Sequence, residues 1–98
     1  MNMRELQKMQ QKLLRMQEEL EKTVFTGTAG GGAVTVTMNG KFEMESIKID
    51  PEAFNPEDIA ELEVMVLAAT KDAQGKVSEA HERMTTNMTG GLKIPGLL

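Results

Sequence analysis

The chain has 98 residues, of which 40% are hydrophobic, and a formal net charge of −4; this length allows one small domain with a modest core, spanning residues 1–98. It contains no cysteine, which excludes disulfides and thiolate chemistry. No apolar run approaches the roughly 18 residues of a membrane span, and from the polar N-terminus we expect no signal peptide. We therefore expect a cytoplasmic protein with no membrane partner.

The composition also bears on assembly. Only three aromatic residues are present, all Phe, so aliphatic side chains and nine methionines must fill the core. Methionine is adaptable and suits irregular gaps and helix seams. Because small cores are often supplemented by oligomerisation, we expect a homodimer.

Residues 4–22 are predicted to form an amphipathic helix. Its apolar residues recur at steps of three and four, which is the spacing of a seam that faces a partner or the core. They are Leu6, Met9, Leu13, Met16 and Leu20. A basic stripe is centred about 130° away around the helix, at about 100° per residue. It consists of Arg4, Lys8, Lys12 and Arg15.

Charge is divided unevenly along the chain. Residues 1–17 hold four basic residues and one acidic residue, whereas residues 18–98 hold seven basic and fourteen acidic residues. Such asymmetry can make an anion-binding face on an acidic protein. The alternative interpretation is that these cations only keep one face of the helix solvated.

Residues 23–49 are predicted to form a three-stranded antiparallel meander. β-Branched residues over 23–28 favour a strand, residues 29–33 a glycine-rich mobile connection, and the alternation over 34–38 a second strand. Asn39-Gly40 indicates a hairpin with a type I′ turn. The apolar phase slips within the returning strand, which predicts a bulge near Glu45-Ser46, or a strand covered on both sides near its end.

Residues 56–89 are predicted to form a long helix, with Asn55 as N-cap and a possible break at Gly75. Around Val64 and Leu67 this helix is apolar on every side. The sheet can cover one face, and we expect a second subunit to cover the other. Residues 90–98 would be a tail. The expected fold class is α+β, with helix, meander and helix in that order.

The sequence offers no warrant for catalysis. His81, the only histidine, has no partner typical of a metal site or a catalytic triad, and we interpret it as a surface or boundary residue. Gly30-Gly31-Gly32 lacks the Gly-Lys-Ser/Thr ending of a phosphate loop. We expect no enzyme activity, no metal, no cofactor and no small-molecule substrate.

Taken in order, the motifs resemble those of the YbaB/EbfC family of bacterial nucleoid-associated proteins. The resemblance rests on the Met/Gln/Lys-rich first helix, on Gly30-Gly31-Gly32-Ala33-Val34, on Asn39-Gly40 and on Ile47-Lys48-Ile49-Asp50-Pro51. It covers nearly the whole chain. It implies a homodimer with helices projecting from a β-containing core, DNA binding of low or variable sequence preference, and a role in nucleoid organisation or gene expression.

Two functional hypotheses follow. In the first, the basic stripe of the first helix contacts the phosphates of duplex DNA, and Lys76 and Arg83 extend that surface. The aromatic residues on which single strands stack are missing, which favours duplex over single-stranded partners. In the second, the protein is a non-enzymatic adaptor whose heptad helix binds another protein, and the cations flank that interface.

Overall fold

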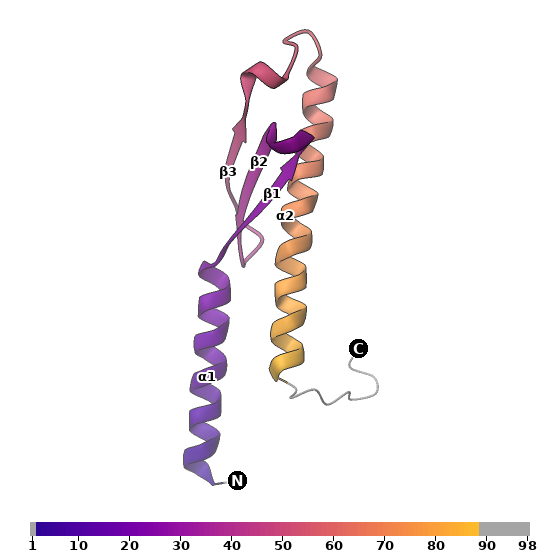
Figure 1. Ribbon diagram of the computed structural model, residues 1–98. Coiled ribbons are helices and arrows are strands. Elements are labelled where there is room, and N and C mark those ends of the chain that lie inside the picture. The colour runs from indigo at the N-terminus through magenta and orange to yellow at the C-terminus, as the bar shows by residue number, and fades with distance from the viewer. Residues whose placement is uncertain (1, 89–98) are drawn as a thin grey trace.

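The computed structural model describes residues 2–88 and confirms the α+β fold class. The elements are α1 (Met3–Lys22), β1 (Val24–Ala29), β2 (Val34–Asn39), β3 (Met44–Ile49) and α2 (Ile59–Met88), with 3₁₀ turns at Gly30–Gly32 and Pro51–Ala53. The strands form an antiparallel sheet in the order β1-β2-β3 (Figure 1). The expected tail over residues 90–98, and the last residue of the expected second helix, lie outside the described residues.

The core lies between α2 and one face of the sheet. Alternation along β2 turns every second side chain toward the helix, and these side chains are buried against small residues of α2. The buried set is Val34, Val36, Met38, Ala69, Ala73 and Val77. Alanines on the inner face of α2 let the helix backbone approach the sheet closely. Phe25 and Phe54 pack at the margins of this core.

The turn between β2 and β3 differs from the expected type I′ hairpin. The loop has three residues before Glu43, with Phe42 N–H donating to the carbonyl oxygen of Asn39 at 3.1 Å. The positive φ falls on Phe42, at 64°, and not on Gly40. The Asn39 side chain explains the difference, because its Oδ1 accepts from the backbone N–H groups of Lys41 and Glu43 and thereby closes a longer turn.

The predicted bulge in the third strand is confirmed. Thr37 pairs with Ser46 and Met38 pairs with Met44, so the register passes over Glu45. The extra residue brings Met44 onto the same sheet face as Ile47 and Ile49, which explains the slip in apolar phase along the sequence.

The second long helix begins at Ile59 and not at residue 56. Asn55 Oδ1 accepts from the N–H of Glu57 in a turn before the helix, and the N-cap is Asp58, whose Oδ1 accepts from the N–H of Glu61 at 3.2 Å. The Asn-Pro signal therefore marks a turn that precedes the helix. The helix runs unbroken through Gly75.

The molecule is elongated because α1 extends away from the sheet. Its radius of gyration is 18.7 Å, against about 13 Å for a compact chain of this length. Figure 1 shows α1 beside the C-terminal half of α2, beyond the end of the sheet. None of the residues of α1 is buried.

Candidate nucleic-acid interface

The four cations of the basic stripe are exposed along α1. None of Arg4, Lys8, Lys12 and Arg15 lies in a salt bridge with a carboxylate anywhere in the described residues 2–88. The helix itself is well started, since Asn2 Oδ1 accepts from the N–H of Glu5 at 2.9 Å. The structure thus places on one helix four positive charges that form no salt bridge within residues 2–88.

The spacing of these charges suits a linear anionic partner. Successive cations are three or four residues apart, which is about 4.5–6 Å along a helix axis. From Arg4 to Arg15 the stripe covers about 16 Å by the same geometry. Of the fifteen acidic residues, only Glu5 lies in the part of α1 that carries the basic stripe, and eleven lie after α1.

The two cations expected to extend this surface from α2 are differently placed. The Lys76 ammonium donates to the carbonyl oxygen of Thr26 at 2.6 Å and lies 3.8 Å from the Asp72 carboxylate. Arg83 pairs with Glu79 at 3.5 Å, four residues earlier on the same helix. Within residues 2–88, both groups therefore have partners in the protein, unlike the cations of α1. Lys76 is hydrogen-bonded to the edge strand β1.

The apolar seam of α1 divides into two parts. Three of its residues are half-buried, namely Leu13, Met16 and Leu20. Met16 and Leu20 line a cleft of about 300 Å³ between α1 and α2, together with Ala80 and Met84 of α2. The other two, Leu6 and Met9, have exposed fractions of 45% and 48%. The outer part of α1 therefore has no covering partner within residues 2–88, although a helix of this length is marginal when isolated in water.

A second apolar surface surrounds β3. Because α2 lies over β1 and β2, the side chains of β3 on that side of the sheet are not covered. Leu67 stands about four helical turns before His81, whose ring contacts the β2–β3 turn, so Leu67 is on the β3 side of α2. We call this surface the β3–α2 patch. Its members are Met44, Ile47, Ile49 and Leu67, all exposed. Val64, one turn before Leu67, is exposed on the side of α2 that faces away from the sheet.

Comparison with known families identifies the chain. The model of the YbaB/EbfC DNA-binding family matches residues 1–92. The protein belongs to this family. This is a family of nucleoid-associated DNA-binding proteins and not of enzymes.

Individual relatives agree with the family assignment. A nucleoid-associated protein of Pelotomaculum thermopropionicum is 50% identical over 95 residues, covering 97% of this chain and 90% of the relative. One from Chloroflexus aurantiacus is 45% identical over 97 residues, covering 95% and 97%. Among solved structures, an uncharacterized protein of Helicobacter pylori, HP0035, matches with a TM-score of 0.73 and 26% identity, covering 92% of this chain and 99% of that one.

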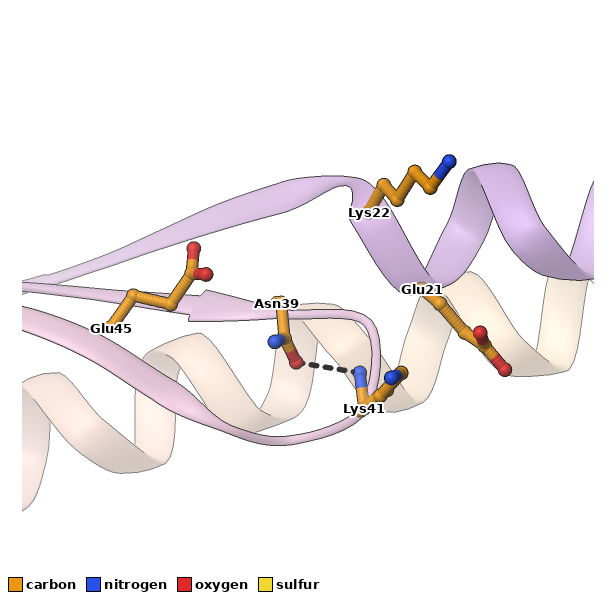
Figure 2. Close-up of a pocket in the computed structure, with 5 residues that line it drawn as sticks. All are labelled: Glu21, Lys22, Asn39, Lys41 and Glu45. Atoms are coloured by element: carbon orange, nitrogen blue, oxygen red, sulfur yellow. Dashed lines mark hydrogen bonds between the residues drawn. The ribbon is translucent and has the colours of Figure 1, made fainter.

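The described part of this YbaB/EbfC protein holds neither a metal-ligand cluster nor a membrane-spanning helix. Over residues 2–88, no cluster of three or more potential metal ligands occurs, and no helix there has the length and apolarity to cross a membrane. A cavity of about 330 Å³ at the junction of α1 and the β2–β3 turn is lined by side chains of mixed charge (Figure 2). They are Glu21, Lys22, Asn39, Lys41 and Glu45.

Two sets of contacts between α2 and the sheet could not be predicted from the sequence. His81 lies at the boundary, half-buried, as expected, but its Nε2 also contacts the carbonyl oxygen of Gly40 at 2.7 Å. Asp72 and Lys76 both bind the backbone of β1. These partners are more than forty residues apart in the chain, so no local pattern indicates them.

Proposed function

We propose that this YbaB/EbfC protein binds duplex DNA as a homodimer, mainly through backbone phosphates and with low sequence preference, and thereby takes part in nucleoid organisation and gene expression. The observation that carries the proposal is the stripe of four exposed cations on α1 without carboxylate partners in residues 2–88. Cations already paired within the protein would have to break those pairs before they could neutralise a phosphate.

The residue types of α1 favour contact with phosphates over reading of bases. Lysine and arginine along one stripe neutralise phosphates whatever the sequence. Base readout in the major groove calls for a few side chains, such as Asn, Gln or Arg, held against particular base edges. The glutamines of α1 are exposed and lie outside the basic stripe, which favours weak rather than strong sequence preference.

The homodimer is supported by the apolar surfaces that the chain does not cover. The exposed seam residues Leu6 and Met9 and the β3–α2 patch are two groups of exposed apolar side chains, and contiguous exposed apolar surface is typical of protein–protein interfaces. Burying them against a second copy would order α1 and bring two basic stripes into one molecule. We place Leu6, Met9, Leu13, Met16, Leu20, Val64 and Leu67 at or beside this interface.

The test is a binding titration with unrelated duplexes at several salt concentrations. Eight phosphate contacts per dimer would give a log–log salt slope of up to about 7. Replacing Arg4, Lys8, Lys12 and Arg15 by Gln should weaken binding strongly and flatten the slope while leaving the dimer intact. A matched variant carries Lys41→Gln, Lys48→Gln and Lys71→Glu, which lowers the net charge by the same four units at exposed positions outside α1.

The outcomes of this titration are distinct. Loss of binding only in the α1 variant supports the proposal, and equal loss in both variants would reduce the stripe to a contribution to net charge. Unchanged binding in the α1 variant would refute the assigned site.

The second candidate function is the protein adaptor, favoured by the exposure of the apolar seam on α1. It requires a stoichiometric protein partner on α1 and no retention on DNA at moderate salt. Competition of a partner helix with dimer formation, measured by light scattering, would distinguish this function from DNA binding.

A further inference from the structure

Within residues 2–88, α1 contacts the rest of the molecule through its last turns, where Met16 and Leu20 face α2. α1 has no buried residue along its length, and Thr23 alone separates it from β1. The N–H of Thr23 closes the helix by donating to the carbonyl oxygens of Glu19 and Leu20. The direction of α1 must therefore be set by whatever touches this end of the helix.

Gly40 is one of the residues that touch this end. Gly40 is buried, and a Cβ atom built there would overlap the carbonyl oxygen of Leu20 and crowd the Cα of Glu21. The last turn of α1 thus rests directly on the backbone of the β2–β3 turn. Any movement of that turn moves the surface against which α1 is seated.

His81 of α2 holds the turn from its other side. Its Nε2 lies 2.7 Å from the carbonyl oxygen of Gly40; since a carbonyl only accepts, Nε2 carries the proton and donates. The His81 ring also stacks on Phe42, with ring centroids 5.5 Å apart and planes 7° apart. Phe42 has a φ of 64°, a conformation that is costly for a bulky residue and needs support from its surroundings.

The turn is stiff enough to connect these two contacts. Asn39 Oδ1 accepts from the N–H groups of Lys41 at 2.8 Å and Glu43 at 3.1 Å, and its Nδ2 donates to the Glu43 carboxylate. Figure 2 shows the first of these bonds beside the end of α1. We call the set Leu20, Gly40, Phe42 and His81 the α1 joint.

We propose that His81 is a positioning residue that sets the direction of α1 relative to α2 through the α1 joint, and so sets how the basic stripes meet DNA. The second clause rests on the proposed function; the first does not. The cleft of about 300 Å³ between α1 and α2 supports the proposal, because helices separated by a cleft are not locked by close packing and can change their angle when the turn is released.

The experiment measures α1 direction and DNA affinity on the same protein. The chain has no cysteine, so spin labels can be attached at Gln11→Cys on α1 and Ser78→Cys on α2, both exposed positions. Labelled chains are diluted into unlabelled chains so that only the distance within one chain is read. His81→Ala should shift or broaden this distance distribution and weaken duplex binding by about 2- to 10-fold, the equivalent of one hydrogen bond.

Two control variants separate positioning from general destabilisation. His81→Gln keeps a donor at the position of Nε2 and should restore the distance distribution and most of the affinity. Val34→Ala creates a cavity in the core at the far end of β2, and should lower the free energy of unfolding without moving α1.

Each outcome is decisive. An unchanged distance distribution in a folded His81→Ala protein overturns the proposal, and so does an equal change in Val34→Ala. A changed distance with no DNA binding by the unsubstituted protein would refute the proposed function and leave the α1 joint standing. A changed distance with unaltered affinity would confine His81 to the direction of α1 and overturn its role in DNA binding.

Discussion

Gly27 lies in β1 at the point where α2 crosses the sheet. A Cβ atom built there would overlap the backbone of Ala69 and Ala73, so the side-chain-free position sets how closely helix and sheet approach. The three inward alanine and glycine positions act together, since each removes volume at the same crossing. The fold therefore depends on the small size of these side chains, which leaves room for the backbones of α2 and β1 to approach each other.

Gly27→Ala should therefore lower the free energy of unfolding by about 1–3 kcal/mol, because α2 must move off β1 to make room. Urea denaturation followed by circular dichroism measures this change. Gly75→Ala is the matched control: a Cβ there meets nothing within 4 Å, and the substitution should stabilise the helix by about 0.5–1 kcal/mol. Similar effects of the two substitutions would contradict the close approach at Gly27.

The edge of β1 shows how one element protects another. Asp72 Oδ2 accepts from the N–H of Thr28 at 2.9 Å, and the Lys76 ammonium donates to the carbonyl oxygen of Thr26. Backbone groups on an edge strand are otherwise open to pairing with other chains. At the scale of the element, α2 both covers the face of the sheet and blocks part of one edge.

We expect Lys76 and Lys12 to behave in opposite ways, although both are lysines on helices. Lys76→Met should cost about 1 kcal/mol of stability through the lost hydrogen bond and leave the salt dependence of DNA binding unchanged. Lys12→Met should leave stability unchanged and lower the salt slope by up to about 2, one contact per chain of a dimer. Thermal unfolding and the salt titration measure the two effects; a reduced slope in Lys76→Met would return Lys76 to the DNA-binding surface.

The whole molecule is a core domain with one long projecting helix. Its elongated form follows from the position of α1, which within residues 2–88 packs on the rest of the protein near its C-terminal end. The exposed β3–α2 patch and the exposed α1 seam are separate apolar surfaces on one small chain. At this scale the proposed homodimer accounts for both.

Ile47→Lys should shift the proposed dimer toward a monomer of 10.8 kDa, because the charge would be buried without a partner in the interface. Light scattering after size exclusion measures the mass. Thr28→Lys adds the same charge to an exposed position on the opposite face of the sheet and should remain dimeric. Dimers of undiminished stability in Ile47→Lys would exclude the β3–α2 patch from the interface.

The local sequence determined the elements of this protein. The 3- and 4-residue steps of α1, the alternation of β2 and the slip of phase at Glu45 each predicted a feature that the structure has, because backbone periodicity is fixed by local geometry. The family resemblance was likewise carried by short motifs in order. The basic stripe of α1 was also readable, since its residues are neighbours on one helix.

The tertiary structure alone decided how these elements are joined. The Asn39 side chain displaced the expected type I′ turn, and Asp58 rather than Asn55 became the cap of α2, because each competing local signal was strong enough to form a turn. The sequence does not distinguish Lys76 from the other exposed cations, and only the structure shows that its ammonium group donates to the backbone of β1. The contact of His81 with Gly40 depends on a meeting of α2 and the sheet across forty-one residues, and no period along the chain encodes that distance.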